Sequence, residues 1–387
     1  MNIIYAANAY TTKAFKKYFS MGINLPGQAA AKYNRLLAEG LTMQDGVSVT
    51  MISEMPINIK NSNQKVIVRR IEVSKGVRYI YLPLINIHRV MDILSFVTAF
   101  LEAMRCAREK GSIVLSDILA VPVALGSYFA ARIMRIPYVA IITDLPEYVY
   151  GKKDKAYKMT SQILIKKADK YVFLTEQMNN KVNNYGKPYV VIEGMTDVSQ
   201  KSDAIRKVDN DIKKCLYTGN LNKKYGIDIL IKGFVRAGIE NTELHICGNG
   251  EMTEELRNNP DKYKNVYYHG CLFSDEVITM QKDATLLINP RPSVPEYTKY
   301  SFPSKTTEYM SSGTPVLMTD LPGVPEEYKK HTYILKDETV IGMTKALKEV
   351  LSLSEAELTE KGYEAYIFVM REKNNRKQAQ KALRLLR

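Results

Sequence analysis

Short apolar runs alternate with segments of helical periodicity along the first half of the chain. Seven runs have the length and apolar content of buried strands, at residues 2–8, 47–56, 79–84, 112–119, 138–147, 171–175 and 188–194. Four intervening segments repeat apolar residues at helical spacing, at residues 28–41, 90–109, 122–136 and 161–169. Nearly continuously apolar strands that alternate with helices are typical of a parallel sheet covered on both faces. The pattern therefore predicts an α/β fold.

The same alternation of predicted strands and helices begins again after residues 197–214, a polar stretch without hydrophobic periodicity. Further strands are predicted at residues 215–220, 243–250, 265–270, 285–290 and 315–319, with a helix at 225–238. Two consecutive units of similar size predict two Rossmann-like, doubly wound domains facing a cleft. The predicted boundaries are 1–196 for the N-terminal domain, 197–211 for a linker, 212–365 for the C-terminal domain and 366–387 for a basic C-terminal helix.

The tail at residues 371–387 carries seven basic residues and one acidic residue. Its apolar residues recur at helical spacing, at Ala379, Ala382, Leu385 and Leu386. Two interpretations remain open, a solvated helix end and a basic surface near an acidic membrane.

The formal net charge of +14 favours an anionic partner. Nucleic acid, an acidic membrane surface and a phosphorylated substrate all fit this charge. Since the sequence has no helix-turn-helix, RNP or zinc-finger motif, we expect no nucleic acid partner. The hydrophobic stretch Val90–Met104 is interrupted by Asp92 and Glu102, so it is interpreted as an amphipathic core helix, with a membrane-dipping helix as the alternative.

Four scattered cysteines, with no CxxC pair, are typical of reduced core residues in a cytosolic protein. The sequence has no zinc-ligand spacing, and we predict neither a metal nor a cofactor. The first ten residues lack the charged region and cleavage site of a signal peptide. A cytoplasmic protein, peripheral on the inner face of a membrane, is therefore expected.

The segment SFPSKTTEYMSSGTPVLM, residues 301–318, predicts a short helix at about 303–312 followed at once by a strand. Pro303 suits the first helical turn and Gly313 the position after the last. The free N–H groups of this turn and the charge of Lys305 could hold a diphosphate. Glu308 lies one turn further and could accept hydrogen bonds from ribose hydroxyls. The alternative is a capped surface helix with a solvated Lys and Glu.

This segment resembles the signature of the retaining GT-B glycosyltransferases known as glycosyl transferases group 1. Glu308 matches the second glutamate of their Glu-x7-Glu pattern, and residues 313–316 match the turn that follows it. Further pieces occur in the family's order, at residues 168–178, 190–198, 216–234, 244–251 and 265–270. The resemblance covers most of the chain and is strongest from 165 to 330. It implies a GT-B fold and transfer of a sugar from a nucleotide donor.

The sequence departs from the family pattern at three positions. Tyr300 stands where the first glutamate is expected. Asn220 and Tyr225 stand where an arginine and a lysine usually contact the donor diphosphate. We therefore expect Lys305, with Arg291 or Lys299, to supply the positive charge. The FPSK and EYM pieces resemble a bacterial capsule and exopolysaccharide subgroup.

The resemblance and the helix together predict a set of site residues. The catalytic candidates are Lys305, Arg291 and Asp144. The donor-binding candidates are Gly219, Asn220, Gly248, Gly250, Lys299, Tyr300, Ser304, Lys305, Thr306 and Glu308.

The N-terminal domain supplies the acceptor-side candidates. The loop after the first strand should face the ligands, with Gly27 as a close-approach residue, although Gly27 also suits an ordinary turn before a helix. Asp144 and Glu147 follow a predicted strand at the place where family members often carry a histidine or an acid near the reacting sugar. The alternative for each is an N-cap or a solvated loop acid.

These features predict a hexosyltransferase-type enzyme that uses a nucleoside-diphosphate sugar, with UDP favoured. The resemblance implies retention of stereochemistry, in which the departing phosphate oxygen takes the acceptor proton. The expected acceptor is a glycan or a polyprenyl-diphosphate-linked sugar in cell-surface polysaccharide biosynthesis, at an anionic membrane surface. We expect metal-independent transfer, because the only Asp-x-Asp candidate, Asp209 and Asp211, lies in the linker. Two alternatives stay open, a non-catalytic GT-B module that supports a partner transferase and a sugar-nucleotide epimerase.

Overall fold

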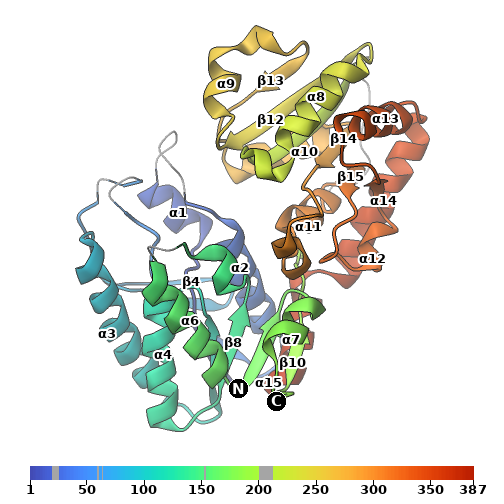
Figure 1. Cartoon of the computed structure of the whole chain (residues 1–387). Coiled ribbons are helices and arrows are strands. Elements are labelled where there is room, and N and C mark those ends of the chain that lie inside the picture. The colour runs from blue at the N-terminus through green and yellow to red at the C-terminus, as the bar shows by residue number, and fades with distance from the viewer. Residues whose placement is uncertain (20–25, 59–60, 63, 152–153, 200–211) are drawn as a thin grey trace. The chain divides into compact units, whose positions relative to one another are not determined.

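The computed structural model describes residues 1–19, 26–58, 61–62, 64–151, 154–199 and 212–387. The chain forms two compact units, which are considered separately (Figure 1). The N-terminal unit comprises residues 1–197 and 374–387, and the C-terminal unit comprises residues 198–373. Most of the predicted linker, including Asp209 and Asp211, lies outside the described residues.

An eight-stranded sheet forms the core of the N-terminal unit, in the order β10-β9-β8-β7-β1-β2-β5-β4. Its strands are β1 (Asn2–Ala6), β2 (Ser48–Ser53), β4 (Arg70–Ser74), β5 (Val77–Tyr81), β7 (Ser112–Asp117), β8 (Tyr138–Ile142), β9 (Lys170–Phe173) and β10 (Tyr189–Val191). All neighbours pair in parallel except β4, which pairs antiparallel with β5. A separate antiparallel pair joins β3 (Val66–Ile67) to β6 (Leu84–Ile85). The central strands β1, β7 and β8 are buried along their whole length, as their apolar sequences predict.

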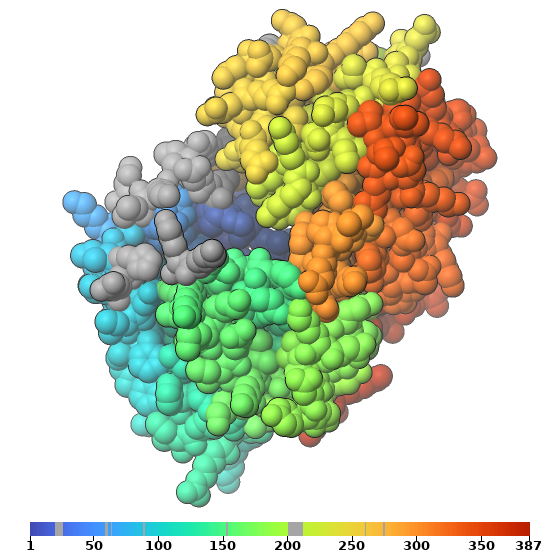
Figure 2. Space-filling model, in the orientation of Figure 1, coloured from blue at the N-terminus to red at the C-terminus, as the bar shows by residue number. Residues whose placement is uncertain are grey.

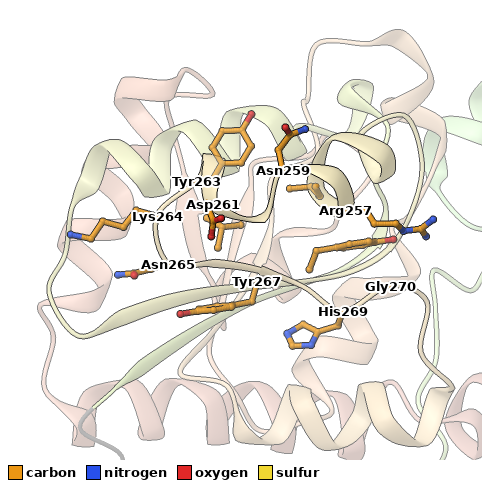
Figure 3. Close-up of a pocket in the computed structure, with 12 residues that line it drawn as sticks. Arg257, Asn259, Asp261, Tyr263, Lys264, Asn265, Tyr267, His269 and Gly270 are labelled. Carbon is orange, nitrogen blue, oxygen red and sulfur yellow. The ribbon is translucent and has the colours of Figure 1, made fainter.

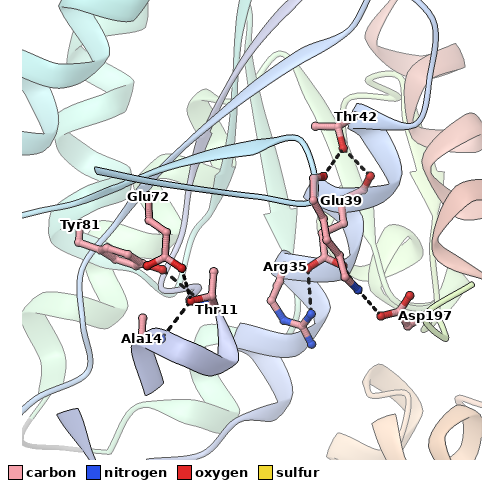
Figure 4. Close-up of polar contacts among 9 residues, drawn as sticks. Thr11, Ala14, Arg35, Glu39, Thr42, Glu72, Tyr81 and Asp197 are labelled. Atoms are coloured by element: carbon pink, nitrogen blue, oxygen red, sulfur yellow. Dashed lines mark hydrogen bonds and ion pairs between the residues drawn. The ribbon is translucent and has the colours of Figure 1, made fainter. Parts of the chain in front are cut away.

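Helices complete the N-terminal unit. They are α1 (Thr12–Tyr18), α2 (Ala29–Thr42), α3 (His88–Cys106), α4 (Val121–Met134), α5 (Pro146–Val149), α6 (Lys155–Lys167), α7 (Glu176–Val182) and α15 (Asn375–Leu386). Thr11 caps α1 by accepting from the N–H of Ala14 at 3.0 Å, and its hydroxyl donates to Glu72 of β4 at 2.9 Å (Figure 4). These bonds fix the start of α1 against the edge of the sheet.

Glu39 of α2 is a buried carboxylate that two cations neutralise. Arg35 lies 2.9 Å and Lys75 lies 3.3 Å from its oxygens, and Lys75 also contacts Asp197 at 2.6 Å (Figure 4). The charges of Glu39 and Lys75 are therefore compensated where the turn between β4 and β5 meets α2.

The C-terminal unit has a six-stranded, wholly parallel sheet in the order β13-β12-β11-β14-β15-β16. Its strands are β11 (Lys213–Asn220), β12 (Thr242–Asn249), β13 (Val266–Tyr268), β14 (Leu286–Asn289), β15 (Val316–Thr319) and β16 (Tyr333–Leu335). Numbered within this unit, the order is 3-2-1-4-5-6, that of a Rossmann sheet. The order reverses between β11 and β14, and ligands bind such sheets outside the carboxyl ends of the strands at this point.

Helices and short 3-10 turns connect these strands. The helices are α8 (Ile227–Ala237), α9 (Thr253–Asn258), α10 (Ser274–Asp283), α11 (Ser304–Met310), α12 (Glu326–Lys329), α13 (Val340–Leu351) and α14 (Glu355–Glu372). The 3-10 turns are η2 (Lys223–Tyr225), η3 (Pro260–Lys262) and η4 (Glu296–Tyr300). The predicted helix at 303–312 is α11, which has seven residues and ends before Gly313.

The C-terminal tail differs from the single helix that the sequence suggested for 366–387. Residues 366–372 complete α14, and a second helix, α15, begins after Asn374. Asn374 caps α15 by accepting from the N–H of Lys377 at 3.0 Å. The apolar side chains of α15 are buried in the core of the N-terminal unit, namely Ala379, Ala382 and Leu386. The tail is therefore not a solvated helix end, because its apolar face covers α2.

Helix α3 only partly matches the predicted core helix. Ala99 and Ala103 are fully buried, whereas Val90, Ile93, Val97 and Leu101 are exposed. None of the helices in the described part of the chain is long and apolar enough to span a bilayer.

Candidate functional site

Three segments of the C-terminal unit meet beside its topological switch point: the carboxyl end of β11, the segment after β14 and the first turn of α11. Lys305, in the first turn of α11, points to the end of β11. Its ammonium nitrogen Nζ donates to the hydroxyl of Tyr217 at 3.3 Å and lies 4.3 Å from the centre of the Tyr217 ring. The lysine that the sequence singled out therefore lies at the edge where Rossmann sheets bind ligands.

Gly219 makes room for this ammonium group. Its φ of +148° is a conformation that residues with a side chain rarely adopt, and a Cβ there would lie 1.6 Å from Nζ of Lys305. Gly248, at the matching position of β12, has a φ of +138°, and its Cβ would lie 1.7 Å from the carbonyl oxygen of Gly219. Gly250 lies close to Leu221, where a Cβ would meet the carbonyl carbon at 2.6 Å. The three predicted glycines thus keep the strand ends free of side chains.

Lys305 is a cation in unfavourable surroundings. Burial lowers the pKa of Lys305 to about 7, Glu308 opposes the shift, and Arg291 adds to it. An anion that bound beside Nζ would favour the charged form and raise this pKa again. The neutral amine form of Lys305 should therefore take up a proton when an anionic ligand binds.

Arg291 follows β14 and extends the positive charge of the site. It donates to the hydroxyl of Ser301 at 2.7 Å, and its guanidinium stacks on Tyr297 at 5.0 Å and on Tyr225 at 5.8 Å. Tyr225, which stands where the family pattern has a basic residue, thus packs on a neighbouring cation. Within the described residues, Nε of Arg291 is buried without a hydrogen-bond partner.

Glu308 lies one turn beyond Lys305, as the sequence predicted for a ribose-binding carboxylate. It accepts a hydrogen bond from Nε2 of Gln281 at 3.0 Å. Thr306 is fully buried, and its hydroxyl has no partner among the described residues. Ser304 is exposed at the first position of α11. Of the first-turn candidates, Lys305 makes the contact to β11.

The remaining donor-binding candidates, Asn220, Lys299 and Tyr300, lie at the end of β11 and in η4. Asn220 is exposed at the end of β11 and accepts from the N–H of Asn222 at 2.9 Å. Lys299 is exposed and Tyr300 is half-buried in η4. Thr298 holds this turn by donating to the carbonyl of Ser293 at 2.7 Å.

Two tyrosines that the sequence analysis missed position the site. The N–H of Thr218 donates to the Tyr309 hydroxyl at 2.9 Å, which attaches α11 to β11. Tyr217 supplies both the ring and the hydroxyl that hold Lys305. Tyr217 lies in an apolar strand and Tyr309 beside Met310 near the end of α11. At such positions a tyrosine is most simply a core residue, and the sequence held no clear signal for either role.

The acceptor-side candidates lie in the N-terminal unit. Asp144 is exposed after β8, and Glu147 of α5 forms an ion pair with Lys181 at 3.2 Å. Gly27 is exposed, and a Cβ there would meet no atom within 4 Å. The structure thus gives Gly27 no close neighbour among the described residues, and part of its loop, residues 20–25, lies outside them.

Two buried carboxyl groups at the carboxyl edge of the N-terminal sheet escaped the sequence analysis. Asp117 ends β7 and accepts from Nδ2 of Asn34 at 2.7 Å and from the N–H of Leu119 at 3.0 Å. Burial raises its pKa. Glu54 follows β2, and burial raises its pKa to about 7. An acid placed directly after an apolar strand was the available signal for both.

A pocket of about 760 Å³ lies beside edge strand β13 (Figure 3). Tyr263, Tyr267, His269 and Gly270 are among its lining residues. His269 also contacts Nδ1 of His245 at 2.8 Å. None of the predicted site residues lines this pocket. At Gly270 the pocket adjoins the end of β12, because the carbonyl of Gly270 accepts a hydrogen bond from the N–H of Gly248 at 2.7 Å.

Comparison with known proteins gives a family match for the C-terminal unit. Residues 212–353 match the model of the family described as glycosyl transferases group 1. No curated protein matches the chain in sequence.

Solved structures share the fold over the whole chain. The sucrose-phosphate synthase of Thermosynechococcus elongatus is 16% identical with a TM-score of 0.71, and the match covers 100% of this chain and 98% of that one. The UDP-forming alpha,alpha-trehalose-phosphate synthase of Burkholderia xenovorans, solved with glucose-6-phosphate, is 10% identical with a TM-score of 0.67 over 100% of both chains. Anabaena HepE, solved with UDP and glucose, is 12% identical with a TM-score of 0.65 over 100% of this chain and 99% of that one.

At these identities the structural matches establish the fold, and the family model identifies the C-terminal unit. The predicted fold class, two Rossmann-like domains of GT-B type, is confirmed at the level of the domains. The chain therefore has the GT-B fold of these structures, and its residues 212–353 match the family described as glycosyl transferases group 1.

Proposed function

We propose that this protein transfers a sugar from a nucleoside-diphosphate sugar, with UDP as the favoured nucleotide. The observation that carries the proposal is the ammonium group of Lys305, which lies against Gly219 at the switch point of the C-terminal sheet. The family model supports sugar transfer. The choice of UDP is supported by Anabaena HepE, which was solved with UDP, and by the UDP-forming synthase of Burkholderia xenovorans.

The proposed chemistry places negative charge on the leaving diphosphate. The bond between the sugar C1 and the phosphate oxygen breaks, a bond from C1 to the acceptor oxygen forms, and the acceptor proton passes to the leaving phosphate oxygen. Lys305 and Arg291 would stabilise the charge on that diphosphate, since a preorganised donor in a dry site is worth a factor of about 100–1000 in rate. Glu308 would bind the ribose, and Tyr300 would face the sugar in place of the missing glutamate.

Several finer points are part of the same proposal. The reaction retains the configuration at C1 and needs no metal, so EDTA should leave turnover unchanged. The acceptor is a glycan or a polyprenyl-diphosphate-linked sugar of cell-surface polysaccharide biosynthesis, as in the capsule and exopolysaccharide subgroup. The net charge of +14 supports an acceptor at an anionic membrane surface, with the protein peripheral on its cytoplasmic face. Asp144 is the third proposed catalytic residue, beside Lys305 and Arg291, and Gly27 and Glu147 are the proposed acceptor-side residues.

Donor choice can be tested by thermal shift with UDP, GDP and dTDP and with their glucose conjugates. A ligand that binds the native state raises the melting temperature in proportion to RT ln(1 + [L]/Kd). We expect the largest shift with UDP ligands. A larger shift with GDP or dTDP would identify that nucleotide, and not UDP, as the one the donor carries. No shift with any of the three would contradict the proposed donor site.

Two substitutions test the roles within the site. Lys305→Met should lower donor turnover by roughly 100-fold or more, measured as release of UDP from UDP-glucose. It should not lower the melting temperature, because it removes a cation that burial disfavours. Glu308→Ala should chiefly weaken UDP binding.

The matched control is Lys345→Met, because the Lys345 side chain on α13 is 77% exposed and lies outside the site. We expect wild-type turnover for this variant. Wild-type turnover in both Lys305→Met and Glu308→Ala would refute the site. Nucleotide binding without any transfer or hydrolysis by the wild type would instead favour a non-catalytic module.

A further inference from the structure

Helix α3 of the N-terminal unit presents a row of large aliphatic side chains to solvent. Ile87, just before the helix, is 61% exposed, and Ile93 is 66% exposed. Val90, Val97 and Leu101 are between 42% and 45% exposed. We call these five residues the α3 face. At about 100° per residue they fall within an arc of roughly 120° on one side of the helix.

The opposite side of α3, which carries small residues, is the side that packs. Ser95, Ala99 and Ala103 are fully buried. Helix α4 approaches so closely that a Cβ on its Gly126 would lie 2.4 Å from the carbonyl oxygen of Phe96. An amphipathic helix normally buries its large apolar residues against the core. Helix α3 fully buries only small residues and buries other large ones, such as Met91 and Phe96, in part, so its exposed row is a candidate contact surface rather than a scattered set of surface residues.

Positive charge flanks the carboxyl end of the α3 face. Glu102 is buried and bonded to Arg69 at 2.8 Å and to Arg105 at 2.7 Å. Arg105 keeps 62% of its side chain exposed, and Arg108, Glu109 and Lys110 are exposed just beyond the helix, so cations outnumber the one exposed acid there. On the amino side, Asp92 points away from the face and accepts from the Tyr157 hydroxyl at 2.5 Å.

The apolar surface continues beyond the helix. Three further aliphatic side chains are exposed there. Val66 of β3 is 58% exposed, Val68, which follows β3, is 75% exposed, and Ile85 of β6 is 37% exposed. Strands β3 and β6 pair with each other, and β6 contacts α3. Figure 2 shows this part of the chain, coloured blue to cyan, at the surface of its unit.

We propose that the α3 face docks on an anionic lipid bilayer, with α3 lying in the plane of the interface. A helix with an apolar stripe and flanking arginines suits this boundary, where the aliphatic side chains reach the acyl region and the guanidinium groups meet lipid phosphates. Lipid is favoured over a protein partner because three exposed cations, Arg105, Arg108 and Lys110, outnumber the one exposed acid, Glu109, at the carboxyl end of the stripe. The inference deepens the proposed peripheral membrane location, on which it rests, by naming the surface that docks. Because it is argued from the exposure and charge of α3, it holds whichever donor the C-terminal unit binds.

The absence of tryptophan from the sequence allows a direct test. A Val97→Trp variant carries a single reporter on the α3 face, and Ile341→Trp carries one at a position that is 62% exposed on α13. Both are mixed with vesicles of phosphatidylcholine, with and without phosphatidylglycerol. We expect a blue shift of the emission maximum for Val97→Trp with the anionic vesicles only, reversed by high salt, and no shift for Ile341→Trp. No shift at Val97→Trp, or an equal shift at both positions, would overturn the proposal.

A second measurement uses a charge rather than a reporter. Ile93→Glu should reduce the affinity of the protein for anionic vesicles, measured by co-flotation, roughly tenfold or more, because the variant loses the burial of an isoleucine in the acyl region and adds a negative charge. Ile341→Glu, which makes the same change on α13, should leave co-flotation unchanged. Both variants should melt as the wild type does, since both positions are exposed. Self-association that Ile93→Glu abolishes, without vesicle binding by the wild type, would assign the face to a second copy of the chain and overturn the lipid proposal.

Discussion

Lys305 lies where a cation would bind a diphosphate and where burial opposes its charge. Burial lowers the pKa of its ammonium group to about 7, well below the usual value for lysine. Its neighbours are the Tyr217 ring, the carboxylate of Glu308 and the guanidinium of Arg291. Near neutral pH, the free site therefore contains both the charged and the neutral form of the lysine. A diphosphate would select the charged form.

Donor affinity should consequently depend on pH in a direction that this pKa fixes. Below pH 7, Lys305 is already charged and the Kd should be flat. Above pH 7, binding must take up a proton, so the Kd should rise about tenfold per pH unit until the pKa of the complex is reached. Isothermal titration calorimetry with UDP-glucose between pH 6 and 9 measures this, and UDP-glucose avoids the terminal phosphate of UDP, which titrates near pH 6.

The Lys305→Met variant is the control for this profile and should bind UDP-glucose weakly, with no change above pH 7. Heats measured in buffers of different ionisation enthalpy should show net proton uptake by the wild type at pH 8. Affinity that increased with pH, or a profile unchanged by Lys305→Met, would contradict the assignment.

Single residues were predicted to very different degrees. Lys305 could be predicted because proline, lysine and glycine occur at fixed offsets in one short segment, which is a local pattern. The roles of Tyr217 and Tyr309 could not, because they depend on how β11 and α11 are placed against each other in space. The same holds for Asn34 and Asp117, whose hydrogen bond joins residues that are 83 positions apart.

At the scale of elements, the edge of the C-terminal sheet that holds Lys305 depends on two strands whose next-to-last residue is glycine. Strands β11 and β12 are in register through Gly219 and Gly248, and both glycines have positive φ. Helix α11 has only seven residues, so its dipole is small compared with the full charge that Lys305 carries. The positive charge at this edge therefore comes mainly from Lys305, which lies beside strand ends that carry glycine, and not from the N-terminus of α11.

Gly219→Ala should displace Lys305 without unfolding the unit. Its Cβ would lie 1.6 Å from Nζ, which is the far end of a flexible side chain and can move away. We expect UDP-glucose affinity to fall roughly tenfold or more, because the displaced cation no longer meets the diphosphate. Calorimetry at pH 7 provides the measurement.

Gly238→Ala is the matched control, because Gly238 also has positive φ, at +56°, but has no neighbour within 4 Å of a Cβ. It should cost about 1 kcal/mol of stability through backbone strain and leave donor affinity unchanged. Equal losses of affinity in the two variants would show that Gly219 acts only through strain.

Elements were predicted best where they are buried. The central strands of both sheets, and helices α2, α3, α4, α6, α8 and α11, correspond to segments that the sequence analysis identified, whereas the edge strand β16 and helices such as α9, α10 and α13 were not predicted. The pattern missed β4, because its burial alternates and it lies at the sheet edge, and it missed the two-residue strands β3 and β6 because they are too short to show a period. It also merged the end of α14 with α15, since a polar break of two residues does not interrupt a helical period.

On the scale of the whole chain, the N-terminal unit is built from two separate segments. Its last helix, α15, is supplied by residues that follow the entire C-terminal unit. Gly40 of α2 allows the close approach, since a Cβ there would lie 2.1 Å from the carbonyl oxygen of Asn375. Gln378 adds a hydrogen bond to the carbonyl of Gly194 at 3.0 Å.

Gly40→Ala should therefore destabilise the N-terminal unit, although alanine is the better helix former by about 1 kcal/mol. The clash with a backbone carbonyl should cost about 1–3 kcal/mol and shift or release α15. Hydrogen exchange followed by mass spectrometry should show lost protection in α15 and α2, with the C-terminal sheet unchanged. Removal of residues 374–387 should give the same pattern, more strongly. A higher melting temperature for Gly40→Ala with full protection of α15 would show that this contact does not matter.

The return of α15 has a consequence for how the protein is made in the cell. During translation the first 197 residues leave the ribosome long before residues 374–387 are synthesised. The apolar surface of α2 that α15 covers therefore stays exposed to solvent while the C-terminal unit is synthesised and folds. The N-terminal unit would then reach its final stability only after that point. A nascent chain stalled before residue 374 should accordingly recruit chaperones through α2, and should release them once the last helix emerges.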